Sequence, residues 1–399
     1  MLVPTFHRRW TADDRAESVY QYVPFDVPSG APAVSLRLEY DGTRAVLDLG
    51  LFDAERFRGY SGGARSEFVV TPSDATPGYL PGPLPAGTWR VLVGLHRIPP
   101  EGVDVMVTVE TGAAWPIDAA GASFEQPESL PRGSTRRLPA APGRRWIAGD
   151  LHAHTVHSDG ALTIDQLADL AVRRGLDFLA VTDHNTVSHH PHLAAAGKRV
   201  GILLLPGQEV TTDTGHANCF GDVGWVDFRR PSDEWVAHAE AAGGLLSLNH
   251  PLAGDCAWRR PLSRSPSLIE AWHSSWDRRS DRPLRWWRAR GGVPVGGSDW
   301  HRPGDPETLG CPTTWVEVTE ELDMLGALRA GRVALSASPH SPVLLRHDGE
   351  LVAVDAETTT IVGPDGRRTP IRGPVRRLPW TDGMHRLVDE DDRVVALVP

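Results

Sequence analysis

The chain has 399 residues, which is enough for two or three domains at roughly 150 residues each. Its formal net charge is −10 and it contains a single lysine, so no basic surface for duplex nucleic acid is indicated. No segment approaches the roughly 18 apolar residues of a membrane span, and the start lacks an apolar signal region, so we expect a cytoplasmic protein without a membrane partner. The preference for arginine over lysine suggests a bacterial protein.

Residues 1–123 contain short β-like runs such as AVSLRLEY, TWRVLVGLH and VDVMVTVE, separated by Gly, Pro, Asp and Ser. This spacing is typical of a β-sandwich. His7 and His96 stand alone in it, and we expect both to be structural. Residues 124–145 are rich in Pro, Arg and Gly with little apolar content, which predicts a linker.

Residues 146–337 alternate strand-like and helix-like segments, which predicts a β/α architecture. The strand candidates include LDFLAV, GLLSL, SLIEAWH and VPVGG, and the helix candidates include TIDQLADLAVRRG and DRPLRWWRARGG. Residues 338–399 return to short β runs separated by Asp-Gly turns, which predicts a small β extension.

The stretch GDLHAHTVHSDG places two histidines and a carboxylate within eight residues: His152, His154 and Asp159. The apolar run before it is too short for a helix. His152 and His154 are therefore expected at a strand end, where side chains two residues apart point to the same face. The pattern alone is weak, because isolated histidines are often hydrogen-bonded structural residues.

Further histidines and acidic residues follow other apolar runs in the same region. Because strand ends gather at one edge in β/α folds, these side chains are expected to converge. They are His184 after LDFLAV, Glu209 after GILLLP, His216, His250 after GLLSL, and Asp299 with His301 after VPVGG.

This ordered set resembles the PHP (polymerase and histidinol phosphatase) family, over residues 146–337. The resemblance implies a distorted (β/α)7 barrel with metal ligands at its strand ends, and it implies metal ligation by all nine residues: His152, His154, Asp159, His184, Glu209, His216, His250, Asp299 and His301. Among them we expect Glu209, Asp299 and His216 to be catalytic. The N-terminal β domain and the IEAW and GSDWH segments resemble the carbaryl-hydrolase-like branch of this family.

Imidazole and carboxylate ligands without thiolates suit manganese, zinc or iron(II). Nine ligands are too many for one ion, so we expect two or three divalent ions that share Glu209 as a bridge. A hydroxide held between two ions is a strong nucleophile near neutral pH, because metals lower the pKa of water from ~15.7 to about 7. The expected reaction is hydrolysis of a small-molecule ester.

The substrate is less well defined by the sequence. The first hypothesis is a phosphoesterase, the second a carbamate or carboxylic ester hydrolase acting on an aryl substrate, and the third a metal-stabilised binding module without activity. Arg302 and Arg259 follow ligand motifs and are candidates for phosphate binding, although both could equally be exposed. Trp258 is a candidate pocket wall, and His157 could contact substrate or orient a ligand. His189, His190 and His192 are expected on a solvated loop.

Overall fold

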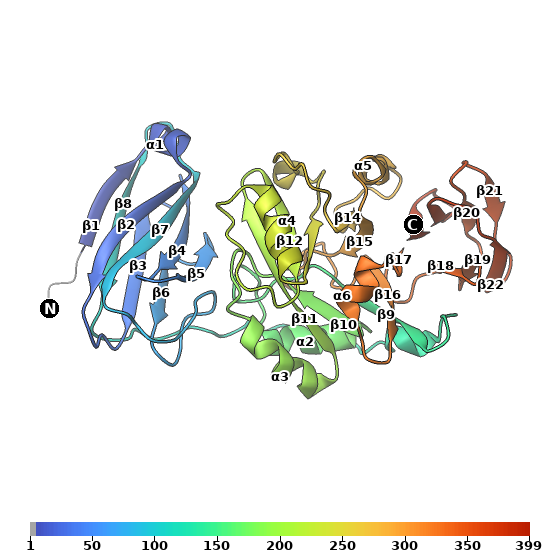
Figure 1. Cartoon of the computed structure of the whole chain (residues 1–399), viewed down its shortest axis with the longest axis horizontal. Coiled ribbons are helices and arrows are strands. Elements are labelled where there is room, and N and C mark those ends of the chain that lie inside the picture. The colour runs from blue at the N-terminus through green and yellow to red at the C-terminus, as the bar shows by residue number, and fades with distance from the viewer. Residues whose placement is uncertain (1–4) are drawn as a thin grey trace. The chain divides into compact units, whose positions relative to one another are not determined.

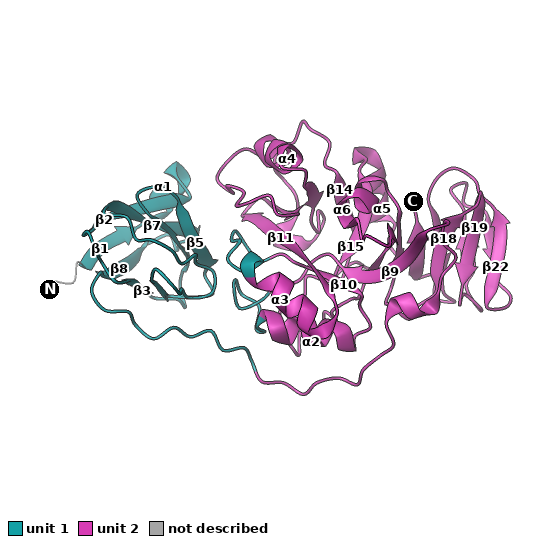
Figure 2. Cartoon of the chain, turned by 60° about the horizontal axis from the view of Figure 1, so that its bottom comes forward, with its two compact units in different colours: residues 1–122, 155–163, 183–191 teal, residues 123–154, 164–182, 192–399 magenta. Residues whose placement is uncertain are grey.

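The computed structural model of the chain describes residues 5–399 and combines helices with a larger share of strands. It divides into two compact units (Figure 2). The first contains the chain up to residue 122 together with the short segments 155–163 and 183–191, and the second contains residues 123–154, 164–182 and 192–399. No helix among the described residues is both long and apolar enough to cross a membrane.

The first unit contains two four-stranded antiparallel sheets, in the orders β1-β8-β3-β6 and β2-β7-β4-β5. Alternation of apolar and polar residues directs one face of each strand inward, as in VDVMVTVE, where every second residue is buried. Trp89, Leu36 and Phe68 lie in the shared core between the sheets. The elements are β1 (Thr5–Trp10), α1 (Ala12–Glu17), β2 (Tyr20–Val27), β3 (Val34–Tyr40), β4 (Val46–Phe52), β5 (Phe57–Gly62), β6 (Glu67–Val70), β7 (Gly87–Arg97) and β8 (Val103–Glu110).

The second unit is built on a sheet in the order β15-β14-β13-β12-β11-β10-β9-β16-β17-β24-β23-β20-β21 (Figure 1). Its first part pairs in parallel except around β12, which is antiparallel to both neighbours. The strands of this part are β9 (Arg144–Asp150), β10 (Phe178–Val181), β11 (Leu203–Thr212), β12 (Gly215–Phe220), β13 (Leu245–Leu248), β14 (Leu268–His273) and β15 (Val293–Gly297). They are followed by β16 (Thr313–Thr319), which is antiparallel to β9, and β17 (Val333–Ser336), which is antiparallel to β16.

Helices connect most of the parallel strands. In α2 the buried residues recur at helical spacing, so one face packs on the sheet. Arg199 of α3 donates hydrogen bonds to Asp165 and Asp169 of α2, which joins the two helices side by side (Figures 1 and 2). The helices are η1 (Gly133–Arg136), α2 (Ile164–Arg173), α3 (His190–Val200), α4 (Ser232–Ala241), η2 (Gly254–Cys256), α5 (Arg282–Arg290) and α6 (Met324–Arg329).

The sheet continues into the C-terminal residues. There β20 (Thr360–Val362), β21 (Arg368–Pro370), β23 (His385–Val388) and β24 (Val394–Val398) extend it, while β18 (Val343–His347), β19 (Glu350–Val354) and β22 (Val375–Pro379) form a separate three-stranded sheet. Because β17 pairs with β24, the C-terminal segment shares hydrogen bonds with the sheet that carries the candidate site.

Candidate metal centre

Glu209 is fully buried at the middle of a group of histidines. Strand β11 pairs in parallel with β10 as far as Pro206 and then continues, which carries Glu209 past the end of that pairing. Its Oε1 lies 3.3 Å from Nε2 of His152, and its Oε2 lies 3.6 Å from Nε2 of His154. These residues and Asp299 each offer a ligand atom, all within 4.8 Å of one another.

A second group shares the same carboxylate. Oε1 of Glu209 lies 3.2 Å from Nδ1 of His216 and 3.3 Å from Nε2 of His250, and these three residues again offer ligand atoms within 4.8 Å of one another. The side-chain amide of Asn249 donates a hydrogen bond of 2.9 Å to the same oxygen. Glu209 is therefore positioned to bridge two adjacent ion sites.

Asp299 lies on the more open side of this group, with 22% of its side chain exposed. Its Oδ1 is 3.1 Å from Nε2 of His152 and 3.0 Å from Nε2 of His154, and its Oδ2 is 3.4 Å from Nε2 of His273. Burial opposes ionisation, but the charge of His152 and the hydrogen bonds from His154 and His273 hold the pKa of Asp299 well below its usual range. His301 stacks on His154 with 4.2 Å between ring centroids.

The donor set fits divalent cations. Burial lowers the pKa of His152, but the neighbouring carboxylates of Asp299, Glu209 and Glu270 outweigh it and raise that pKa well above the ordinary value. The negative charge of three carboxylates around one buried imidazole is therefore stabilised by nearby positive charge, which metal ions supply. Nδ1 of His250 is also buried without a hydrogen-bond partner among the described residues.

Two residues of this centre were missed by the sequence analysis, Glu270 and His273 of β14. Glu270 accepts a hydrogen bond of 2.6 Å from the backbone of His250 and lies 3.1 Å from Nδ1 of His152, so it orients two candidate ligands. His273 lies beside Asp299 and 2.7 Å from Oγ of Ser275. The register of β14 against β15 shifts between Glu270 and Trp272.

Backbone hydrogen bonds fix the strand ends around the site. Asp150, the last residue of β9, accepts from the backbone of His152 (3.1 Å), Ser298 (3.0 Å) and Gly310 (2.8 Å). It thereby ties the segment after β9 to the segment after β15. Asp299 itself has a positive φ of 56°, a conformation disfavoured for non-glycine residues and frequent at functional sites.

The remaining predicted ligands in the 155–191 region belong to the first unit. Oδ1 of Asp159 lies 3.5 Å from Nε2 of His184. Asp183 fixes their surroundings, because it accepts hydrogen bonds from the backbone and hydroxyl of Thr155 (2.8 and 2.7 Å) and from the hydroxyl of Ser158 (2.6 Å). This is the orienting role expected of an acid beside a ligand histidine.

The prediction of a solvated histidine loop was wrong for the loop and for His189, whereas His192 is exposed as predicted. His189 is fully buried, and its Nδ1 lies 3.3 Å from Asp183. His190 and His192 lie in the first turn of α3 rather than on a loop. The sequence could not distinguish these cases, because the apolar spacing of α3 begins only after them.

The sandwich in the first unit contacts the two segments that carry Asp159 and His184. Arg65 donates to the backbone oxygens of Ser158 (3.0 Å) and Val156 (2.5 Å). Gly78 donates to the hydroxyl of Ser188 (3.0 Å) and accepts from that of Thr186 (2.8 Å). A Cβ at Gly78 would lie 2.9 Å from the backbone oxygen of His157, so no larger residue fits without a shift.

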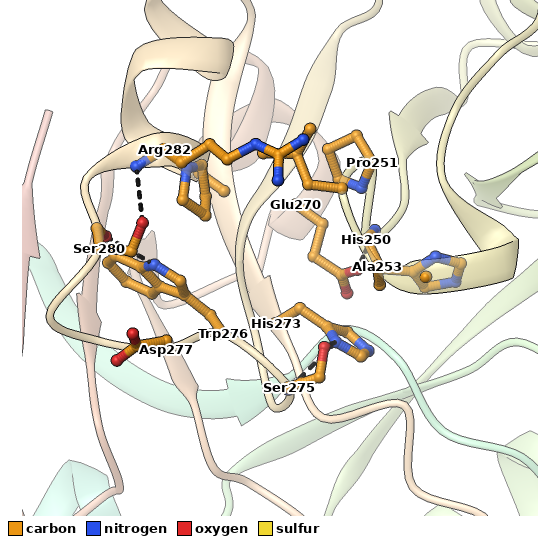
Figure 3. Close-up of a pocket in the computed structure, with 14 residues that line it drawn as sticks. His250, Pro251, Ala253, Glu270, His273, Ser275, Trp276, Asp277, Ser280 and Arg282 are labelled. Atoms are coloured by element: carbon orange, nitrogen blue, oxygen red, sulfur yellow. Dashed lines mark hydrogen bonds between the residues drawn. The ribbon is translucent and has the colours of Figure 1, made fainter.

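A pocket of about 410 Å³ adjoins the centre in the second unit (Figure 3). His250, Glu270 and His273 line one side of it, and Trp276 and Arg282 line others. The rest of the lining comes from residues 251–254, from Ala271 and Pro283, and from the segment between β14 and α5.

The four predicted substrate contacts are not among the residues that line this pocket. The side chain of Arg302 is 55% exposed and 3.9 Å from Asp305, while Arg259 donates to backbone oxygens. Trp258 is buried, and its ring packs against Gly215. His157 lies with its Nδ1 2.7 Å from the hydroxyl of Ser188.

The similarity to known proteins covers short parts of the chain. A 5'-3' exoribonuclease of Haemophilus influenzae is 39% identical over 64 residues, covering 16% of this chain and 23% of that protein. A 3',5'-nucleoside bisphosphate phosphatase of Chromobacterium violaceum is 44% identical over 66 residues, covering 16% and 23%. The alignments thus span less than a quarter of these relatives.

Among solved structures, one from Bacteroides vulgatus is described as a two-domain protein containing a predicted PHP-like metal-dependent phosphoesterase. It matches with a TM-score of 0.44 and 16% identity, over 70% of this chain and 99% of that one. The family model of the PHP domain matches residues 150–253, which include seven of the nine predicted ligands, all except Asp299 and His301. The chain therefore contains a PHP domain.

Proposed function

We propose that this protein is a metal-dependent hydrolase of phosphate esters. The observation that carries the proposal is the buried carboxylate of Glu209, which belongs to both ligand groups of the second unit. A shared carboxylate fixes the distance between two ions, an arrangement used for the in-line displacement of phosphate esters.

We assign one ion to His152, His154, Glu209 and Asp299, and a second to Glu209, His216 and His250. Asp159 and His184, 3.5 Å apart, are proposed ligands of a further ion, with His301 as the ninth ligand of the whole set. Mixed imidazole and carboxylate donors favour manganese, zinc or iron(II). When bound, such ions lower the pKa of water and stabilise negative charge on the phosphoryl group.

The side chains of this chain would orient and move protons around the reaction. Glu270 and Asn249 hold ligand residues in place through the hydrogen bonds described above. Asp299, the most accessible carboxylate of its ligand group, is the proposed proton acceptor at Oδ2, next to His273. His216, partly exposed at the edge of the second group, is the third proposed catalytic residue.

The names of the relatives support the choice of phosphate esters over other substrates. Besides the exoribonuclease and the bisphosphate phosphatase, a phosphoribosyl 1,2-cyclic phosphate 1,2-diphosphodiesterase of Eggerthella lenta is 37% identical over 62 residues, covering 16% of this chain and 24% of that protein. All three names denote cleavage of a phosphoester. We also infer that strands β9 to β16 wrap into the distorted barrel expected from the sequence, supported by hydrogen bonds between Gly296 of β15 and the Thr314 side chain of β16.

A carbamate or carboxylic ester hydrolase is the second candidate. The pocket beside His273 favours it, because Pro251, Leu252 and Trp276 supply apolar walls that suit an aryl group.

The deciding experiment measures turnover of a matched aryl series, phenyl phosphate, phenyl acetate and phenyl N-methylcarbamate, by the protein reconstituted with manganese, zinc or iron(II). We expect phenyl phosphate to have the highest kcat/KM. Preferential cleavage of the acetate or carbamate would replace the first candidate with the second. If no ester is cleaved while metal binds, the protein is a metal-stabilised binding module.

A further inference from the structure

We propose that the pocket beside His273 binds the organic group of the substrate, and that this group is a flat apolar ring system carrying a second negative charge, which Arg282 recognises. The proposal rests on the phosphoesterase function proposed above. It concerns a site that is separate from the predicted phosphate contacts, Arg302 and Arg259.

One side of the pocket is the metal centre itself. His250 is a proposed ligand, and Glu270 and His273 contact the ligands His152 and Asp299. A substrate whose phosphoryl group lies at this centre can therefore place the organic group of its ester in the adjoining pocket. Because the pocket of about 410 Å³ falls in the ordinary range for small-molecule sites, it can hold one or two rings.

The middle of the pocket is lined by apolar side chains, and the indole of Trp276 among them is fixed by its contacts. The indole of Trp276 donates to the backbone oxygen of Ser280 (2.8 Å) and packs edge-on against Trp272, with 5.2 Å between ring centroids. Pro251 and Ala253 face it from the other side (Figure 3). A fixed indole beside aliphatic side chains favours a flat aromatic or heteroaromatic group.

The side of the pocket away from the metal centre contains a positively charged side chain, that of Arg282. Arg282 begins α5, and its side chain extends across the pocket toward Pro251 (Figure 3). Its guanidinium has no ion pair or hydrogen bond to an acidic side chain among the described residues, whereas Arg285 of the same helix pairs with Asp281 at 2.7 Å. The lining contains two acids: Glu270 lies on the side of the metal centre, and Asp277 lies at the Trp276 end, where it accepts a hydrogen bond from the backbone of Arg279 (3.1 Å).

An arginine at the rim of an apolar pocket discriminates between ligands by charge. With a neutral ring bound, the guanidinium of Arg282 would stay hydrated. A carboxylate or phosphate on the ring would instead accept charge-assisted and often bidentate hydrogen bonds from it. We therefore expect the protein to prefer an ester whose leaving group is itself anionic.

The first test measures binding without turnover. Calorimetry compares 4-hydroxybenzoate with phenol, in the wild-type protein loaded with metal, in Arg282→Gln and in the matched control Arg285→Gln. We expect 4-hydroxybenzoate to bind about tenfold more tightly than phenol, this ratio to fall to near one in Arg282→Gln, and the ratio to persist in the control. Equal binding of both compounds by the wild type would overturn the proposal.

The second test measures the same discrimination in catalysis. The ratio of kcat/KM for 4-carboxyphenyl phosphate over phenyl phosphate should be about ten in the wild type and in Arg285→Gln, and near one in Arg282→Gln. A ratio unchanged by Arg282→Gln would refute the role of this arginine while leaving the phosphoesterase function intact. Conversely, Arg282-dependent binding of 4-hydroxybenzoate without hydrolysis of either phosphate would sustain the pocket and refute the proposed function.

Discussion

The guanidinium of Arg65 donates a hydrogen bond of 3.0 Å to the backbone oxygen of Ser158, the residue immediately before Asp159. A second bond from the same guanidinium reaches Val156, so one side chain of the sandwich holds both ends of the turn that leads into Asp159. The position of this proposed ligand thus depends on a residue more than ninety positions earlier in the chain.

Replacing Arg65 with Ala should therefore weaken metal binding. Residues that orient metal ligands typically contribute about 10- to 100-fold in affinity, and we expect a loss of that size in chelator competition with zinc. Limited proteolysis should also cut residues 155–163 faster in the variant. The control is Arg37→Ala, which removes an exposed pair with Glu67 on the sandwich surface. Wild-type metal affinity in Arg65→Ala would show that the turn holds its shape alone.

Glu209→Gln should abolish hydrolysis and lower metal content together, because an amide cannot bridge two cations as a carboxylate does. The measurement pairs elemental analysis with kcat/KM on a phosphate ester. Glu240→Gln, which alters an exposed carboxylate paired with Arg264, should leave both values unchanged. Full activity of Glu209→Gln would mean that the bridge has been assigned to the wrong residue.

Removal of metal should destabilise the protein. Ions that bind only the folded chain stabilise it by about 2.7 kcal/mol at a concentration 100 times Kd. For a domain of 150 to 250 residues this corresponds to a Tm about 5 to 10 °C lower in the chelated protein. Differential scanning calorimetry before and after chelation, followed by metal addition, measures the shift. An unchanged Tm would contradict a folded-state metal centre.

Glu270→Gln should weaken metal binding without removing a ligand. Glutamine keeps an acceptor for the backbone of His250, but it removes the charge that stabilises the ring of His152. We expect metal affinity to fall about 10-fold, at the lower end of the range for groups that orient ligands. In Glu350→Gln, an exposed carboxylate paired with Arg377, affinity should not change. Zinc titration of both variants measures these affinities, and an unchanged affinity in Glu270→Gln would contradict the orienting role of Glu270.

Alkaline pH should destabilise the protein through Cys219. Burial raises the pKa of this thiol to about 12 in the folded state. Since the folded value lies above that of the unfolded chain, the contribution is present below about pH 8.5 and is lost as the pH rises toward 12. Between pH 8 and 10 the loss is about 2 kcal/mol. The free energy of unfolding of wild type minus that of Cys219→Ala should fall by this amount, and a flat difference would exclude the effect.

Most candidate ligands could be predicted because they follow short apolar runs, which mark strand ends; His216 is an exception, because it lies near the start of β12. The apolar stretch FLAV became β10, with His184 just beyond it, and the run before Asp299 became β15. The alternation in VDVMVTVE likewise predicted β8 correctly, because one face of that strand is buried.

Glu270 and His273 could not be predicted in the same way. They are three residues apart and would point to opposite faces of a regular strand. The irregularity at Ala271 adds one residue to β14, so both side chains reach the centre while Trp272 packs into the core on the other face. Irregularities of this kind depend on pairing with the neighbouring strand and leave no periodic signal in the sequence.

The pocket could not be predicted from the sequence either. Trp276 and Arg282 lie in the segment between β14 and α5 and at the start of that helix, and nothing in their spacing links them to His250. Arg302 and Arg259 follow ligand motifs in the sequence, but neither residue is part of the pocket lining.

Gly78 has a consequence for how this protein can be altered. Its φ of 101° and its contact with the backbone of His157 exclude a side chain, although Gly78 itself lies in the sandwich. A substitution there would press on the backbone oxygen of His157 in the segment 155–163 as well as on that of Tyr60 in the sandwich. The first 122 residues are therefore unsuited to exchange for another β-sandwich of similar size, because a replacement would also have to reproduce the surface that receives these two segments.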